Sequence, residues 1–324
     1  MDAALSTLLS PVILFFALGI LAGFARSDLA IPESIAKGMS LYLMAAIGLK
    51  GGVQVAEAGF TAEIGLALLA GLSLSALLPL IAFPLLRGFG RLDGINAGAV
   101  AAHYGSVSVV TYVTGVEILT AMDTAPAGFM VAVLALMETP AIVVGIWLAA
   151  RGTDKGAPGT SRNLWHEVLL NGSVVLLVGA FFVGLLSGPS GFAPVAPLFE
   201  DIFRGILCLF LLDMGLIASR RLLEAKALTK RLVTLALVLP VINGAIGAAI
   251  AALIGLEGGT AAALAILAAS SSYIAVPAAM RMALPQANAG LYLSLSLGIT
   301  FPFNITLGIP LYSWMAATFA GLLS

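Results

Sequence analysis

The chain has 324 residues, of which 60% are hydrophobic and only 10% are charged. A soluble domain carries about 25% charged residues, so this composition excludes a soluble protein and predicts an integral membrane protein. The formal net charge is −1, and because the sequence has no basic patch or nucleic-acid motif, we exclude a nucleic-acid partner.

Apolar stretches of about 17–28 residues, each long enough to cross a lipid bilayer as a helix, follow one another along the chain. We predict membrane spans at about 9–25, 32–52, 61–86, 95–118, 126–150, 167–187, 195–218, 232–255, 259–282 and 287–318. The predicted fold is therefore an all-α integral membrane protein with ten transmembrane helices. The N-terminus lacks a basic region, so we expect the first span to be retained rather than cleaved.

The basic residues indicate the orientation of these spans, because Lys and Arg remain on the cytoplasmic side. Twelve of the 15 Lys and Arg residues fall in alternate connections: Arg26, Arg87, Arg91, Arg151, Lys155, Arg162, Arg220, Arg221, Lys226, Lys230, Arg231 and Arg281. The other connections hold only Lys50. We therefore expect a multi-pass protein of the cell inner membrane with both termini outside.

Four segments of the chain recur in order about half-way along, which predicts an internal repeat. The pairs are 33–38 with 200–205, 47–49 with 214–216, 101–106 with 267–272, and 138–140 with 300–302. Since five spans per copy is an odd number, the second copy enters the membrane from the opposite side. The sequence thus predicts two inverted five-helix repeats, 1–151 and 166–324, joined by a polar cytoplasmic linker at 152–165, an organisation typical of secondary transporters.

Spans four and nine contain small polar residues at corresponding positions, where we predict that each helix is broken. The clusters hold Gly105, Ser106 and Ser108 in the first repeat, and Ser270, Ser271, Ser272 and Tyr273, followed by Pro277, in the second. Irregular backbone at membrane depth is tolerated where it lines a cavity or is buried in protein. Two half-helix N-termini and serine hydroxyls can hold a small anion there. The alternative is that the small residues only allow close helix packing.

Glu138 lies well inside the fifth span, where a carboxylate is costly and marks a functional site by default. It can ligate a cation such as Na⁺, carry a proton, or pair with a buried base. Its repeat mate Thr300, followed by Pro302, supplies a hydroxyl and a second break. Asn304 lies on the same helix and adds a neutral oxygen ligand.

Three further groups are open to more than one interpretation. Asp213, inside the seventh span, is a coupling or a structural residue, and His103 is a proton carrier or a packing residue. Arg204 is expected to reach the membrane interface or to join other helices. Tyr312 and Trp314 fit an interfacial aromatic belt. Cys208 is the single cysteine and only two histidines exist, which excludes a disulfide framework and makes a histidine metal centre improbable.

The chain resembles the sodium-dependent bicarbonate transporter family of bacteria. The resemblance rests on Ile31-Pro32-Glu33-Ser34-Ile35, Ile47-Gly48-Leu49 followed by Gly51-Gly52, Leu198-Phe199 with Arg204-Gly205, Ala269-Ser270-Ser271-Ser272, and Gly298 with Pro302. It implies ten spans in two inverted halves, a core domain that moves against a gate domain, and a homotrimer. It also implies a bicarbonate ion between the paired breaks, at Gly105 and Ser106 in one half and Ser270, Ser271 and Ser272 in the other.

Two positions depart from the family pattern. Tyr273 follows the three serines where better-known members have an aspartate associated with sodium coordination. Glu138-Thr139-Pro140 stands where they have an aspartate before Ile-Pro, so that carboxylate is one methylene longer here.

The function predicted from the sequence is secondary active transport of a small anion, most simply bicarbonate, by alternating access coupled to Na⁺ or H⁺. The alternatives are an anion channel with a serine-rich filter and a carrier of another small carboxylate. An enzyme is disfavoured because no Ser–His–Asp or metal constellation recurs, and no cofactor is expected beyond Na⁺ as a coupling ion.

Overall fold

The computed structural model describes residues 9–59, 61–151, 172–224 and 228–323. Within these ranges all regular secondary structure is helical, which confirms the predicted all-α class. The predicted linker at 152–165 lies outside the described residues, and the division into two repeat domains stays a prediction.

The first half of the chain forms helices that end where the linker begins. They are α2 (Pro11–Phe24), α3 (Glu33–Ala58), α4 (Ala62–Gly88), α5 (Gly94–Gly105), α6 (Val109–Ala121), α7 (Met130–Met137) and α8 (Pro140–Arg151). The second half forms α10 (Gly172–Phe192), η1 (Ala193–Val195), η2 (Pro197–Asp201), α11 (Phe203–Glu224), α12 (Lys230–Leu253), α13 (Gly258–Ala269), α14 (Ala275–Ala283), α15 (Ala289–Leu293), η3 (Ser294–Thr300), α16 (Phe301–Phe303), η4 (Asn304–Gly308) and α17 (Ile309–Leu323).

Short polar side chains define where many of these helices begin. The side chains of Ser10, Thr61, Asp93, Ser108, Thr229 and Asn288 each accept a hydrogen bond from a backbone N–H in the first turn of the helix that follows. Such N-caps satisfy amide groups that have no partner inside the helix. Local sequence chemistry therefore fixes the helix starts in both halves of the chain.

Seven helical segments of the described chain are long and apolar enough to cross a membrane. The apolar helices α2 and α13 are shorter. Predicted span four corresponds to α5 and α6, and predicted span nine to α13 and α14. Both predicted breaks are thereby confirmed, whereas the arrangement of ten spans in inverted repeats stays a prediction.

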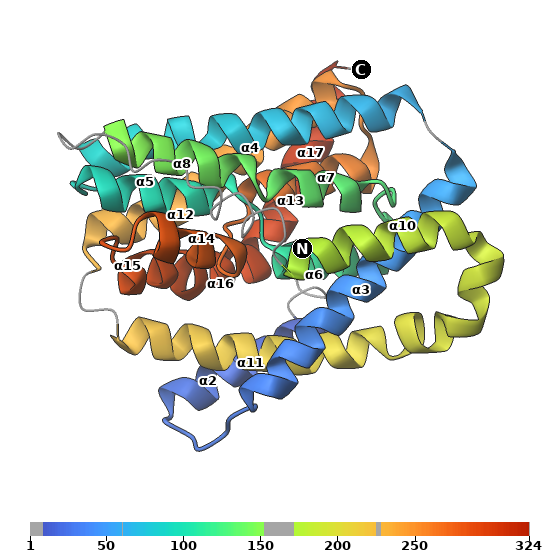
Figure 1. Cartoon of the computed structure of the whole chain (residues 1–324), viewed down its shortest axis with the longest axis horizontal. Helices are drawn as coiled ribbons and strands as arrows, with labels where there is room; N and C mark the ends of the chain where they lie inside the picture. The colour runs from blue at the N-terminus through green and yellow to red at the C-terminus, as the bar shows by residue number, and fades with distance from the viewer. Residues whose placement is uncertain (1–8, 60, 152–171, 225–227, 324) are drawn as a thin grey trace.

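The helices pack as two groups. In the first, which we call the four-helix group, α2 packs against α11 and α3 packs against α10; these helices fill the lower part of Figure 1, with α10 at its right. In the second, which we call the crossing group, α4, α5 and α8 pack together, as do α12, α13 and α17. α6, α7, α14, α15, α16, η3 and η4 complete the crossing group, in which α13 contacts α6, whereas η1 and η2 pack against α10, α11 and α3 and belong to the four-helix group.

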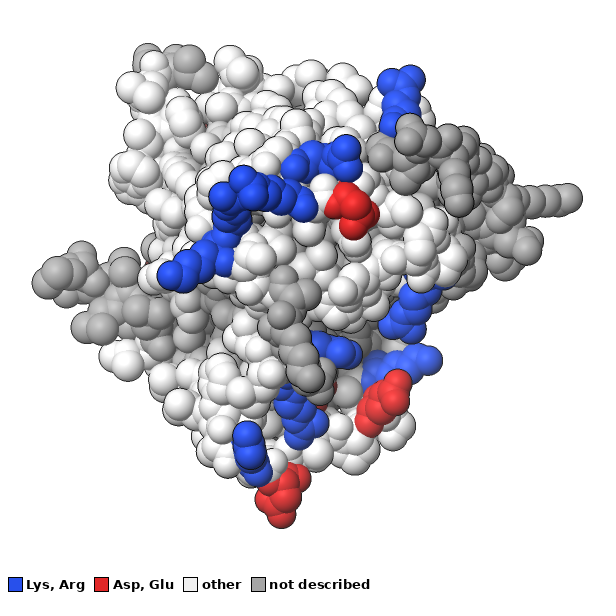
Figure 2. All heavy atoms as spheres, turned by 90° about the vertical axis from the view of Figure 1, so that its left-hand side faces the viewer, with Lys and Arg blue, Asp and Glu red and all other residues white. Residues whose placement is uncertain are grey.

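Lys and Arg side chains gather on one end of the molecule (Figure 2). At this end α4, α8 and α11 finish and α12 begins (Figure 1). Arg87, Arg151 and Arg221 lie in the last turns of the three helices that finish there, and Lys230 is the first residue of α12. This distribution agrees with the predicted positive cytoplasmic side.

Tyr312 corrects one expectation. It was predicted to lie in an interfacial belt with Trp314, but its side chain is fully buried and its hydroxyl donates to Asn304 Oδ1 at 2.6 Å. Trp314 is 63% exposed. Because the two residues are two positions apart on α17, they point to different sides of the helix, so the expectation is wrong for Tyr312 alone.

Glycines bring α3 and α10 into close contact, and one of them allows a stability test. A Cβ atom added to Gly52 would meet the backbone of Phe181 and Leu185, whereas one added to Gly38, also on α3, would meet nothing within 4 Å. We therefore expect Gly52→Ala to lower the free energy of unfolding by about 1–3 kcal/mol relative to Gly38→Ala. Thermal unfolding of the two detergent-solubilised variants measures this difference, and equal melting temperatures would contradict the close approach.

Candidate functional site

The two helix breaks lie against each other. The backbone N–H of Ser108, in the first break, donates to Ser270 Oγ at 3.0 Å. The backbone N–H of Ser272, in the second break, donates to the carbonyl of His103 at 2.9 Å. All four residues are buried. The structure thus brings together the two segments that the sequence pairs only through the repeat.

Serine chemistry explains why the helices end at these positions. Ser106 and Ser270 close α5 and α13 in an extended backbone conformation. Ser270 Oγ also donates to the carbonyl of Leu267 at 2.8 Å, and Ser108 Oγ accepts from Thr111 N at 3.2 Å. Serine side chains offer the backbone partners other than the helix ladder, so each hydroxyl here replaces a helical hydrogen bond that the break removes.

Gly105 is required by packing at the end of α5. A Cβ atom at this position would meet the ring of Pro79 on α4 and the side chain of Ala141 on α8. Glycine therefore lets the first break approach two neighbouring helices.

Two asparagines bind the carbonyl groups that the breaks leave free. Asn243 Nδ2, from α12, donates to the carbonyl of Tyr104 at 2.9 Å. Asn304 Nδ2, from η4, donates to the carbonyl of Ala269 at 3.1 Å. The sequence indicated Asn304 but missed Asn243, for which the available signal was a single amide side chain in a strongly apolar helix.

Several buried polar atoms around the breaks have no hydrogen-bond partner among the described residues. They are Ser271 Oγ, His103 Nε2, Asn243 Oδ1, Glu138 Oε2 and the hydroxyl oxygen of Tyr273. Buried polar atoms are normally paired, and an exception asks for an explanation such as a ligand or an ion. The helices α6 and α14 begin within a few residues of the two breaks along the chain, and helix N-termini favour anions. This set of groups is suited to binding a small anion and a cation together.

Glu138 lies at the junction of α7 and α8, next to the first break. Its side chain is buried, and its carbonyl accepts a hydrogen bond from Ser106 Oγ at 3.0 Å. Ser75 of α4 supports the same junction, since its hydroxyl donates to the carbonyl of Met137 at 2.6 Å and accepts from Ala141 N at 3.2 Å. Sequence reasoning missed Ser75, which looks like an ordinary small residue in an apolar helix.

Thr300 is buried, but its hydroxyl already has partners. It donates to the carbonyl of Ala236 at 2.7 Å and lies 2.7 Å from the hydroxyl of Tyr104. The prediction of a second break near Pro302 is wrong, because the chain stays helical there and passes through the wide turns η3 and η4. Such turns satisfy the backbone groups that a proline frees.

His103 is placed by a ring contact and a hydrogen bond, and Tyr273 by a ring contact. His103 Nδ1 lies 2.7 Å from the carbonyl of Ala99, and its ring centroid is 4.5 Å from that of Tyr292. The Tyr273 ring meets Phe301 edge-on, with centroids 5.2 Å apart. Both residues are buried beside the breaks.

Asp213 lies apart from this cluster. It is buried on α11, in the four-helix group, and α11 packs mainly against α2. The cluster formed by the two breaks therefore includes Glu138, His103 and Asn304 from the predicted coupling residues, and Asp213 belongs to a different part of the molecule.

In the described part of the chain, no group of three or more His, Cys, Asp or Glu residues is arranged to hold a metal ion. A cation beside Glu138 would take its other ligands from hydroxyl, amide and carbonyl oxygens, which hard cations prefer. The ends of broken helices supply such carbonyls in transporters that use Na⁺.

The sequence profile described as the Na⁺-dependent bicarbonate transporter superfamily matches residues 11–317. It covers nearly the whole chain, which confirms the resemblance seen in the sequence. No curated protein matches the chain.

Ser270 and Ser271 are adjacent and buried, yet only Ser270 bridges the two breaks. We expect Ser270→Ala to lower the free energy of unfolding by about 1–3 kcal/mol, because the buried N–H of Ser108 loses its acceptor. Ser271→Ala, the matched control, removes a hydroxyl that has no hydrogen-bond partner among the residues that the structure describes, and should leave stability unchanged. Thermal unfolding in detergent distinguishes them, and equal losses in both variants would rule out the bridging role.

Proposed function

Because the chain belongs to the Na⁺-dependent bicarbonate transporter superfamily, we propose that it carries bicarbonate across the membrane together with Na⁺, by alternating access. Its role as a membrane transporter follows from the family. The substrate, the coupling ion and the mechanism are the proposal, and the observation that carries it is the mutual contact of the two helix breaks.

The proposed anion site lies between the breaks. A bicarbonate ion there would accept hydrogen bonds from Ser271 Oγ and from those first-turn amides of α6 and α14 that do not already donate to Ser108 or Ser272, without a basic side chain. Ser271 Oγ is buried and has no hydrogen-bond partner among the described residues. Serine suits this task because its hydroxyl both donates and accepts, and bicarbonate carries an O–H donor beside its acceptor oxygens.

The proposed cation site lies beside Glu138. Its carboxylate has an oxygen with no hydrogen-bond partner in the described part of the chain, and the carbonyl of the same residue accepts a hydrogen bond from Ser106 of the first break. A cation at this carboxylate would offset the charge of the anion. Moving a single negative charge against 100 mV costs about 2.3 kcal/mol, so import of the anion benefits from a co-transported cation.

The packing of the helices supports movement of two bodies. α2 from the first half packs on α11 from the second, and α10 from the second half packs on α3 from the first. Two inverted repeats related by a two-fold axis would produce this reciprocal packing, in which a helix of each half packs against a helix of the other half. We propose that the crossing group carries the site and slides against the four-helix group.

The first test measures transport directly. In proteoliposomes that contain the purified protein, an inward Na⁺ gradient should drive saturable uptake of radiolabelled bicarbonate. A proton gradient imposed alone separates H⁺ coupling from Na⁺ coupling, and formate or acetate as competitor tests another small carboxylate. Single-channel currents in a planar bilayer would instead support an anion channel and contradict the carrier.

The second test removes the proposed cation ligand. Glu138→Gln should reduce uptake about tenfold or more and flatten its dependence on the driving cation, since a hydrogen bond or ligand to a charged group contributes about 1.5–3 kcal/mol. Glu63→Gln is the matched control, because Glu63 is exposed at the start of α4. Unchanged uptake by the Glu138 variant would discard the coupling role.

A further inference from the structure

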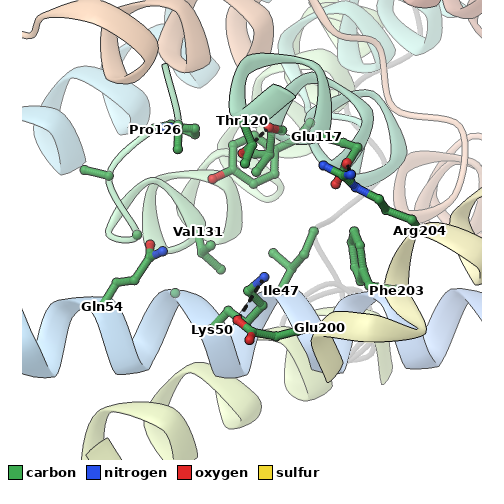
Figure 3. A pocket seen from close by; sticks show the side chains of 16 residues that line it. Ile47, Lys50, Gln54, Glu117, Thr120, Pro126, Val131, Glu200, Phe203 and Arg204 are labelled. Atoms are coloured by element: carbon green, nitrogen blue, oxygen red, sulfur yellow. Dashed lines mark hydrogen bonds and ion pairs between the residues drawn. The ribbon is translucent and has the colours of Figure 1, made fainter. Parts of the chain in front are cut away.

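A cavity of about 230 Å³ lies between the two helix groups (Figure 3). The four-helix group contributes α3, η2 and α11 to its walls, and the crossing group contributes α6, the start of α7 and the connection between them. That connection includes Ala125, Pro126 and Ala127 and belongs to the connections that lack basic residues, so the charge pattern predicts that the cavity opens to the outside.

One face of α6 connects this cavity to the candidate site. Tyr112, Val116 and Thr120 line the cavity, and they follow Ser108 at intervals of four residues, which places all four on one side of the helix. Ser108 is the N-cap of α6 and bonds to Ser270 in the second break. At 1.5 Å per residue, Tyr112 lies about 6 Å along the axis from Ser108. The cavity is therefore adjacent to the breaks, with the buried ring of Tyr112 at its inner end.

Two ion pairs occupy the walls of the cavity. Arg204 of α11 pairs with Glu117 of α6, and Lys50 of α3 pairs with Glu200 of η2 at 3.3 Å. Figure 3 shows the Arg204–Glu117 pair beside α6 and the Lys50–Glu200 pair along α3. The first pair joins the crossing group to the four-helix group, whereas both members of the second belong to the four-helix group.

We propose that the Arg204–Glu117 pair is a latch that holds the two helix groups together on the outer side and must open for an anion to reach the breaks from this cavity. This inference rests on the proposed movement of the two groups. Arg204 is 63% and Glu117 15% exposed, and ion pairs in contact with water are weak enough to be broken and remade. The Lys50–Glu200 pair would travel with the four-helix group and stay closed.

The charges in the cavity fit a latch better than a permanent anion site. Two cations and two carboxylates leave no net charge while both pairs are closed, so the closed cavity has no field that retains an anion. Opening the first pair frees a guanidinium on one wall and a carboxylate on the other, which attract the anion and the cation respectively. The same movement thus widens the entrance and creates charges suited to both proposed substrates.

The test reads the opening of the cavity without any transported ion. Val116→Cys in a Cys208→Ser background places the single thiol of the chain in the cavity wall, where the rate of labelling by a membrane-impermeant methanethiosulfonate added from outside reports access. We expect Glu117→Gln and Arg204→Gln each to raise this rate at least severalfold. The exchanged pair, Glu117→Arg with Arg204→Glu, should restore the slow rate.

Lys50→Gln is the matched control and should leave the labelling rate unchanged, because its ion pair does not connect the groups. Equal rates in the parent and the Glu117 and Arg204 variants, or an equal rise in the Lys50 variant, would overturn the latch. Labelling needs no substrate, so a response of the latch variants in a protein without bicarbonate uptake would reject the proposed substrate and retain the latch. If Na⁺-driven uptake is intact but the Glu117 and Arg204 substitutions do not change the labelling rate, the latch is rejected and the proposed function is kept.

Discussion

The rest of this structure depends on the hydrogen bonding of backbone groups that two broken helices leave free at membrane depth. Lipid offers these groups no partner, and each unsatisfied group costs several kcal/mol. The breaks supply partners to each other through Ser108 with Ser270 and through Ser272 with His103. Neither break could persist alone in the same form, because part of its backbone is satisfied only by the other.

The two asparagines complete this arrangement from outside the breaks. Asn243 and Asn304 each donate to a carbonyl at the end of a broken helix, and Tyr312 orients Asn304 through its Oδ1 atom. Within the described ranges, several buried side-chain atoms beside these satisfied backbone groups have no hydrogen-bond partner, Ser271 Oγ among them. A site of this kind is preorganised: the protein pays for the breaks through its own contacts and leaves specific atoms for ligands.

Sequence reasoning reached the parts of the structure that leave a local signal. The breaks follow from Gly, Ser and Pro within apolar spans, and Glu138 is visible as a carboxylate in such a span. Ser75 leaves no such signal, Asn243 leaves only a single amide in an apolar helix, and Glu117 is a carboxylate at the very end of a predicted span. Their roles come from partners on other helices, to which no periodicity in the chain relates them. For Arg204, the sequence predicted contact with another helix but did not identify Glu117 as its partner. The break predicted at Pro302 is absent because wide helical turns accommodate the proline.

The charge in the proposed site limits how coupling can work. The family resemblance predicts a carboxylate at the position of Tyr273, whose ring packs against Phe301; among the residues that the structure describes beside the breaks, Glu138 supplies a buried carboxyl group. An ionised Glu138 together with bicarbonate places two negative charges in a region of low dielectric, where unpaired charge is costly. One Na⁺ would neutralise half of this charge, so the proposed occluded state would become neutral only with a second Na⁺ or with a proton on Glu138. In the proposed cycle, the protonation of Glu138 would therefore decide whether a neutral occluded state holds two Na⁺ ions, or one Na⁺ ion beside a protonated carboxyl group.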